Sequence, residues 1–140
     1  MSSHPAEQIK LPRALINQLM RHAQNGDGKE VCGFVASLNG EAVKTYPIGN
    51  IATLAEKRFE MEPKAQINAL KNMREQGLAL FAIYHSHPTS PAAPSQVDID
   101  EFSYPEALSM IISLDTQGVL ELRAFRITGA ETVEVAIEIK

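Results

Sequence analysis

The 140-residue sequence predicts an α/β (α+β) protein in which one β-sheet is flanked by helices. Segments with apolar residues at helical spacing alternate with short apolar or alternating segments that are typical of strands. Hydrophobic residues make up 44% of the chain and charged residues 21%, which is close to the average of globular proteins. The sequence has no internal repeat, low-complexity tract or linker, so we expect residues 1–140 to form a single domain.

Two long helices are predicted from the spacing of apolar residues, after a flexible tail that we expect over the polar residues 1–8. The first helix is expected over Leu11–Gln24, where Pro12 suits the first turn and the Asn-Gly-Asp-Gly sequence that follows is a stop signal. The second helix is expected over Pro63–Gln76, with Gly77 at its end.

The expected strands are short apolar or alternating segments, and they are Val31–Leu38, Ala42–Tyr46, Leu78–Ser86, Ala107–Leu114, Val119–Ile127 and Val133–Ile139. The dipeptide Asn39-Gly40 indicates a hairpin between the first two of them. The segment Leu78–Ser86 is apolar almost throughout, which predicts a central strand.

The segments between these elements are expected to be irregular. Residues 50–58 have no clear period and are interpreted as a loop. Three prolines in residues 88–94 predict a stiff loop, which leads into a short helix over Ser95–Phe102. Residues 115–118 are interpreted as a turn.

Charge and cysteine content exclude several classes of protein. The chain has 13 Lys and Arg residues against 17 Asp and Glu residues, a net charge of −4 that argues against a protein that binds nucleic acid. Its single cysteine, Cys32, excludes an internal disulfide and a Cys-rich zinc site, and we interpret it as a small buried hydrophobic residue. The sequence contains no secretory signal and no apolar stretch long enough for a membrane, so we expect a soluble cytoplasmic protein.

The most informative segment is His85–Pro88, which is followed by Ser95 and Asp98. Side chains two residues apart on a strand point to the same face, so His85 and His87 project side by side at the end of the central strand. Asp98 lies eleven residues after His87, and the proline-rich loop between them can fold it back over the end of the strand. Two imidazoles and one carboxylate leave the fourth tetrahedral position for water, which is typical of catalytic zinc sites. Zinc in such a site lowers the pKa of the water to about 7 and can polarise a carbonyl.

A hydrolase also needs a group that transfers protons. Glu30 is the candidate, because it directly precedes a predicted strand and could take a proton from the water and pass it to the leaving amine. Ser95 could donate a hydrogen bond to the oxyanion of a tetrahedral intermediate. The residues alone do not place Glu30 near His85.

Each of these residues also has a simpler interpretation. Ser95 and Asp98 have the spacing of a helix capping box, which is compatible with Asp98 as a metal ligand. An isolated His is most often a satisfied polar residue, and an isolated Glu is most often a solvated charge. The joint spacing favours a site, because His-x-His-x7-Ser-x2-Asp would arise in a random chain of this composition with a probability of about 2 × 10⁻⁴.

This pattern resembles the JAMM motif of the MPN-domain (JAB/Mov34) metalloproteases, and the compact chain is similar to their free-standing prokaryotic members. The resemblance covers essentially the whole chain, and all five motif positions carry the residue types of the family. It implies that His85, His87 and Asp98 bind Zn²⁺, that Glu30 is the general acid/base and that Ser95 stabilises the intermediate. It also implies a curved mixed sheet with flanking helices, similar to the cytidine deaminase core.

The resemblance implies hydrolysis of a peptide or isopeptide bond after the C-terminal Gly-Gly of a small ubiquitin-like or sulfur-carrier protein. We expect the substrate tail to lie along a strand edge in a groove that admits only glycine. A non-catalytic scaffold or carrier-binding module is the alternative, although such relatives usually lack the ligand set that this chain retains. A zinc deaminase would need the Pro-Cys-x-x-Cys ligands that a chain with one cysteine cannot supply. The oligomeric state stays open.

Five further residues receive simple interpretations. His4 and His22 are expected at the surface. Ser86 should face away from the two histidines and serve in packing or hydrogen bonding. Phe59 and Met61 are interpreted as core residues, with a place in a substrate groove left open.

Overall fold

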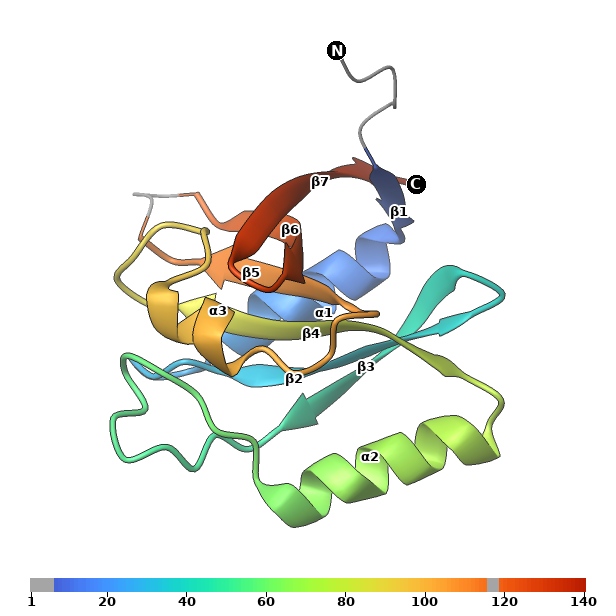
Figure 1. Ribbon diagram of the computed structural model, residues 1–140, viewed down its shortest axis with the longest axis horizontal. Coiled ribbons are helices and arrows are strands. Elements are labelled where there is room, and N and C mark those ends of the chain that lie inside the picture. The colour runs from blue at the N-terminus through green and yellow to red at the C-terminus, as the bar shows by residue number, and fades with distance from the viewer. Residues whose placement is uncertain (1–6, 116–118) are drawn as a thin grey trace.

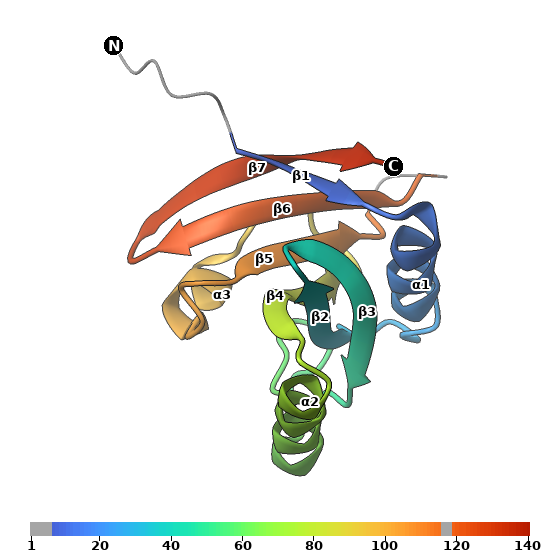
Figure 2. The same ribbon diagram turned by 90° about the vertical axis from the view of Figure 1, so that its right-hand side faces the viewer.

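In the computed structural model, which describes residues 7–115 and 119–140, a mixed seven-stranded sheet is flanked by three helices (Figure 1). In chain order the elements are β1 (Gln8–Leu11), α1 (Arg13–Gln24), β2 (Cys32–Leu38), β3 (Glu41–Ile48), α2 (Pro63–Glu75), β4 (Ala79–His87), α3 (Gln96–Glu101), β5 (Leu108–Ser113), β6 (Glu121–Thr128) and β7 (Glu131–Ile139). The strands lie in the order β1-β7-β6-β5-β4-β2-β3, with parallel pairing of β1 with β7 and of β4 with β5. Figure 2 shows the strong curvature of this sheet. The predicted α+β class with a curved mixed sheet is therefore confirmed.

The helices cover opposite faces of the sheet (Figure 2). On one face, α1 buries Leu15, Leu19 and Ala23 in the larger hydrophobic core. On the other face, α2 buries Ala69 and Met73 in a second core, and α3 lies on the same side. Within the described ranges, no helix is long and apolar enough to cross a membrane.

The strand β4 lies inside the sheet, between β2 and β5, as its apolar sequence predicts. Its last six residues are all buried. The pairing of β4 with β2 is antiparallel, so the C-terminal end of β4 lies beside the start of β2. Residues that are far apart in the sequence therefore meet at this end of the sheet.

The strand β1 is missed by the sequence interpretation, which assigns Leu11 to the first helix. Ile9 and Leu11 are buried while Gln8 and Lys10 are exposed, but an alternation of four residues is too short to stand out. Pro12 disfavours helical backbone at the residue before it, so α1 begins only at Arg13. The ends of the other predicted helices and strands differ from those observed by at most two residues.

Two of the residues expected in a flexible tail are held at the sheet, Glu7 by hydrogen bonds to it and Gln8 as part of a strand. The carbonyl of Glu7 accepts a hydrogen bond from the amide of Ala136 at 3.0 Å, and its carboxylate pairs with Arg126 at 2.8 Å. Gln8 begins β1. Residues 1–6, which include His4, lie outside the described part of the chain, as do residues 116–118 of the predicted turn.

The strands β2, β3 and β4 approach one another closely at Gly33. A Cβ atom at this position would lie 2.6 Å from the hydroxyl of Tyr84 and 2.4 Å from the carbonyl oxygen of Tyr46. The Tyr84 hydroxyl also forms a 2.7 Å hydrogen bond with Nδ1 of His22. His22 is therefore half-buried, which corrects the expectation of a surface residue, and burial lowers its pKa.

We predict that Gly33→Ala destabilises the fold by about 1–3 kcal/mol, because the added methyl group overlaps backbone and a buried ring. Gly49→Ala is the matched control, since the nearest atom to its added Cβ lies 4.0 Å away. Urea unfolding followed by circular dichroism measures both. Equal midpoints for the two variants would contradict the close approach at Gly33.

Candidate metal centre

The pleat of β4 places two imidazoles side by side at the end of the strand. His85 and His87 point to the face that carries α3, and their exposed fractions are only 2% and 3%. Ser86 points to the other face, where its hydroxyl accepts a hydrogen bond from the Val31 amide at 2.8 Å. The Ser86 amide donates to the Val31 carbonyl at 3.0 Å. The hydrogen-bonding role expected of Ser86 is thus confirmed.

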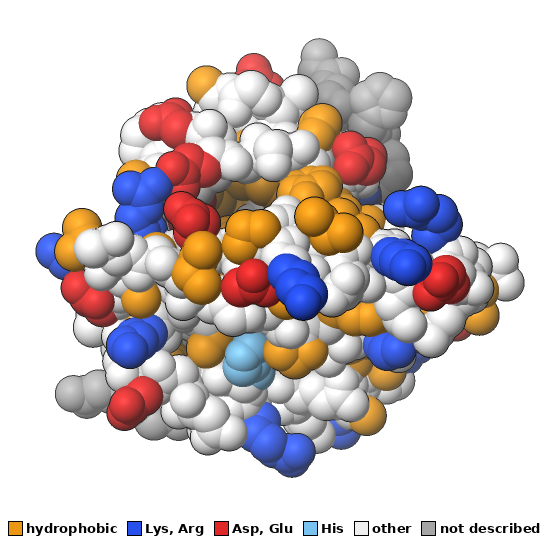
Figure 3. Space-filling view, turned by 90° about the horizontal axis from the view of Figure 1, so that it is seen from below, with side chains coloured by type: hydrophobic (Ala, Val, Ile, Leu, Met, Phe, Trp, Pro, Cys, Tyr) orange, Lys and Arg blue, Asp and Glu red, His pale blue; other side chains and the backbone are white. Residues whose placement is uncertain are grey.

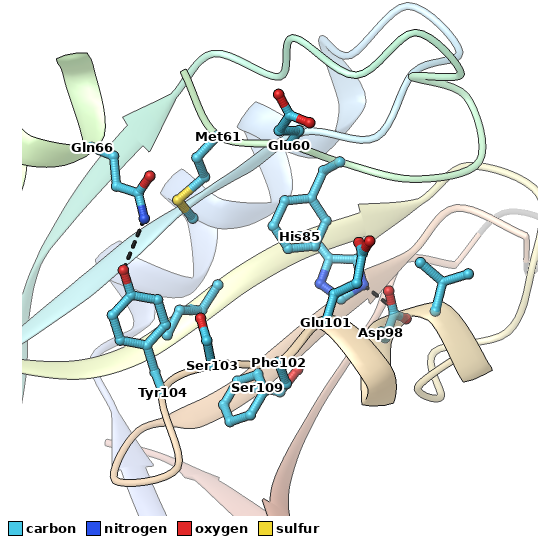
Figure 4. Close-up of a pocket in the computed structure, with 13 residues that line it drawn as sticks. Glu60, Met61, Gln66, His85, Asp98, Glu101, Phe102, Ser103, Tyr104 and Ser109 are labelled. Carbon is cyan, nitrogen blue, oxygen red and sulfur yellow. Dashed lines mark hydrogen bonds and ion pairs between the residues drawn. The ribbon is translucent and has the colours of Figure 1, made fainter. Parts of the chain in front are cut away.

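Three donor atoms from β4 and α3 converge on one point. Nε2 of His85 lies 3.1 Å from Nε2 of His87, and Oδ2 of Asp98 lies 3.2 Å and 3.0 Å from these two nitrogens. Figure 4 shows the His85 ring facing the Asp98 carboxylate. Ligand atoms at about 2.0 Å from a tetrahedral zinc ion lie about 3.3 Å apart. The triangle therefore has nearly the size of one face of such a coordination shell.

The hydrogen bonds of His87 favour a cation at this point. Its Nδ1 lies 2.7 Å from the carbonyl oxygen of Pro91, which can only accept, so Nδ1 carries the proton and Nε2 a lone pair in the neutral ring. That lone pair faces the carboxylate of Asp98 at 3.0 Å. Lone pairs so close repel one another unless a proton or a metal ion lies between them. One cation would satisfy all three donor atoms, and the residues therefore fit a divalent metal ion.

Ser95 and Asp98 also form the capping box that their spacing predicts. The Ser95 hydroxyl accepts a hydrogen bond from the Asp98 amide at 3.1 Å, and the Ser95 amide donates to Oδ2 of Asp98 at 2.9 Å. The same oxygen completes the donor triangle, so the cap holds it in place. Because the Ser95 hydroxyl acts as acceptor in the cap, its own proton remains free for another partner.

Glu30 is brought to the same face by the pairing of β2 with β4. Val31 exchanges two hydrogen bonds with Ser86, so the preceding residue lies opposite His87. Directly opposed side chains on antiparallel strands share a face. Glu30 is 5% exposed, and its Oε1 atom has no hydrogen-bond partner in the described part of the chain.

The close packing of these groups shifts their pKa values. Burial raises the pKa of Glu30 to about 7, against the attraction of His87. For Asp98, burial is outweighed by the hydrogen bonds with His85 and His87, which hold its pKa well below the usual range. Burial lowers the pKa of His85. For His87, burial is outweighed by the hydrogen bonds to Asp98 and Pro91, which raise its pKa.

A cleft of about 190 Å³ opens beside the donor atoms (Figure 4). His85 and Asp98 lie at one end, and at the other end Gln66 donates a 2.8 Å hydrogen bond to the Tyr104 hydroxyl. The walls between these ends combine apolar and polar side chains, namely Phe59, Met61, Ile83, Val97 and Phe102 with Glu60, Glu101, Ser103 and Ser109. Phe59 and Met61 thus line a groove as well as the core, the alternative that the sequence leaves open.

Hydrophobic side chains also reach the surface around this cleft. Figure 3 shows them gathered near the middle of the face on which α2 lies. Ile67 of α2 is 65% exposed, and Val97 of α3 is 39% exposed. Exposed apolar side chains are therefore present on both α2 and α3, and Val97 of α3 also lines the cleft.

Two further residues lie beside the centre: Phe59, whose contact with His85 the sequence does not predict, and Asn50, which sequence reasoning misses. The ring of Phe59 stacks on His85, with centroids 4.7 Å apart and planes 27° apart. The side-chain amide of Asn50 donates a 2.9 Å hydrogen bond to the carbonyl oxygen of Glu30. Both residues lie between β3 and α2, and Asn50 begins the segment 50–58 that has no clear period, so no pattern in the sequence marks it.

Residues 12–128 match the model of a protein family described as prokaryotic homologues of the JAB domain. A Thermus thermophilus protein named "Probable TtuB-protein conjugate cleaving protease" is 36% identical over 93 residues, or 66% of this chain and 62% of that protein. A Haloferax volcanii protein named "Desampylase" is 27% identical over 130 residues, covering 89% and 91% of the two chains. A Mycobacterium tuberculosis protein named "CysO-cysteine peptidase" is 25% identical over 127 residues, covering 89% and 86%.

Solved structures share the same architecture. A protein from Desulfitobacterium hafniense superposes with a TM-score of 0.83 at 28% identity, covering 95% of this chain and 93% of that chain. A JAB1/MPN domain protein from Archaeoglobus fulgidus superposes with a TM-score of 0.60 at 16% identity, covering 94% and 98%. This second likeness shows that the fold is that of a JAB1/MPN domain.

We predict that Glu30 makes the metal-free protein less stable as the pH rises. Its folded pKa of about 7 lies above the ordinary value of 4.5, so the folded state binds more protons between these values. The contribution of Glu30 to the free energy of unfolding is complete below about pH 4.5. It is lost as the pH rises through 7, which lowers the free energy of unfolding by about 1–3 kcal/mol. Urea unfolding with a chelator at pH 5 and pH 8 measures it. Glu30→Gln should remove this pH dependence, and an unchanged dependence in the variant would contradict the assignment.

Proposed function

Because the chain belongs to the family of prokaryotic homologues of the JAB domain, we propose that it is a zinc-dependent peptidase or isopeptidase. The observation that carries the proposal is the convergence of His85, His87 and Asp98 on one point, with the buried carboxylate of Glu30 on the same face. This set contains three potential ligands and one group for proton transfer, as metal-dependent hydrolysis requires.

In this proposal, His85, His87 and Asp98 hold the zinc ion. Zinc, when bound, supplies Lewis acidity and lowers the pKa of a water molecule at its open position to about 7. Glu30 takes a proton from the attacking water and delivers it to the leaving amine. Burial of the Glu30 carboxylate raises its pKa, which favours uptake of a proton from the water. The Ser95 hydroxyl donates a hydrogen bond to the oxyanion of the tetrahedral intermediate.

We infer that the substrate is the bond after the C-terminal Gly-Gly of a small ubiquitin-like or sulfur-carrier protein. Relatives that match over most of the chain are named "Desampylase" and "CysO-cysteine peptidase". The deep burial of His85 and His87 supports a narrow approach to the donor atoms. A chain without side chains next to the scissile bond fits such an approach best.

The first test of this proposal is zinc-dependent cleavage. We predict that metal analysis finds about one zinc ion per chain. We also predict that the protein cleaves a carrier–peptide adduct, as followed by mass spectrometry, and that a chelator abolishes this cleavage. Glu30→Gln should retain zinc and lose activity by about 10²–10⁴-fold, because only the proton transfer is removed. Glu131→Gln, a change at an exposed glutamate of β7, is the control and should be as active as the wild type. A chain without zinc after careful purification would support a non-catalytic scaffold instead.

A second prediction concerns the carrier. Replacing its terminal glycine with leucine should lower kcat/KM by about 10- to 100-fold, because in this proposal the residue before the scissile bond must pass a narrow approach to the buried ligands. Steady-state kinetics on the matched pair of adducts measures this effect. Equal cleavage of both adducts would exclude a narrow groove and with it the Gly-Gly preference.

A further inference from the structure

The loop of residues 49–62 contacts the first of the two histidines through an aromatic ring. Phe59 stacks on His85, whose Nδ1 atom is buried and has no hydrogen-bond partner in the described ranges of the chain. His87, in contrast, is held by the carbonyl of Pro91 at 2.7 Å. The orientation of the His85 ring therefore depends on packing against the loop instead of on a hydrogen bond to Nδ1.

The same loop holds the backbone of Glu30 on both sides of its Cα atom. The Glu30 amide donates to the carbonyl of Ala55 at 2.7 Å. The Glu30 carbonyl accepts from Nδ2 of Asn50 at 2.9 Å. Since Oε1 of the carboxylate has no partner of its own in the described chain, these backbone contacts fix where the side chain starts.

The side-chain amide of Asn50 connects these contacts. Besides the Glu30 carbonyl, Nδ2 donates to the carbonyl of Arg58 at 3.1 Å. Oδ1 accepts from the amides of Ala52 and Glu60, each at 2.9 Å. The partners of Nδ2 are carbonyl oxygens, which can only accept, and the partners of Oδ1 are amide groups, which can only donate. The orientation of the Asn50 side chain is therefore determined, and both its nitrogen and its oxygen are fully hydrogen-bonded.

The loop is also connected to the third element of the centre. Arg58 forms an ion pair with Glu101 of α3, the helix that carries Asp98. Both side chains are largely exposed, so this pair adds little stability. Within the loop, the hydrogen bonds of Asn50 flank Phe59 directly, at Arg58 and Glu60.

We propose that Asn50 is a positioning residue of the hydrolytic site. It ties the backbone of Glu30 to the loop that carries Phe59, and it thereby sets the carboxylate of Glu30 and the ring of His85 relative to each other. This role rests on the proposed function, because it acts on the groups assigned there to proton transfer and to metal binding.

The test compares Asn50→Ala with Asn72→Ala. Asn72 lies on α2 and accepts hydrogen bonds from Tyr46 and Lys44, so its loss removes side-chain hydrogen bonds of an asparagine away from the centre. We expect Asn50→Ala to lower kcat by about 10- to 100-fold with KM within about twofold, and to raise the cobalt dissociation constant about tenfold. Cobalt titration followed by visible absorption gives this second readout without turnover. Asn72→Ala should change neither quantity.

A second variant keeps the test decisive if Asn50→Ala fails to fold. Asn50→Asp retains an acceptor for the amides of Ala52 and Glu60, but it places an oxygen against the carbonyls of Glu30 and Arg58. It should lower kcat as Asn50→Ala does. Wild-type kcat and cobalt affinity in both Asn50 variants would overturn the role of Asn50 while leaving the proposed function intact. A wild-type chain that neither binds cobalt nor cleaves would overturn both.

Discussion

The candidate centre depends on one constraint, the register in which β2 pairs with β4. A slip by one residue would turn Glu30 to the opposite face of the sheet and place Val31 beside the donor atoms. Two contacts on the far face hold this register: the hydrogen bonds between Val31 and Ser86, and the close approach of Gly33 to the buried ring of Tyr84. Contacts on the face covered by α1 therefore set the position of Glu30 on the opposite face, where the donor atoms of the candidate centre lie.

The burial of the groups in the centre opposes folding. Two imidazoles and two carboxylates are removed from water there, which is unfavourable unless the groups are paired or bind a cation. The two hydrophobic cores beneath α1 and α2 offset this cost from either side of the sheet. A buried polar cluster between apolar layers is typical of a functional site, where local stability is given up for reactivity.

Most of the architecture can be predicted from the spacing of residues along the chain. The pleat of a strand is enough to place His85 and His87 together, and a capping box is enough to orient Asp98. The position of Glu30 cannot be derived in this way, because it depends on a pairing between segments more than fifty residues apart. The contacts of Asn50 cannot be predicted for a related reason. Its hydrogen-bond partners are backbone groups, which every residue has, so the residue types do not indicate them.

The hydrogen bond between His87 and the main-chain carbonyl at position 91 has a consequence for how this centre tolerates mutation. Every amino acid carries that carbonyl, so no exchange of side chain at position 91 deletes the acceptor, and the tautomer of His87 is buffered against genetic change. The hydrogen bond from Asn50 to the Glu30 carbonyl has no such protection, because it requires the asparagine side chain and a substitution at position 50 removes it. The orientation of the His87 ring is thus protected against side-chain mutation at position 91, while the placement of Glu30 depends on the identity of one side chain.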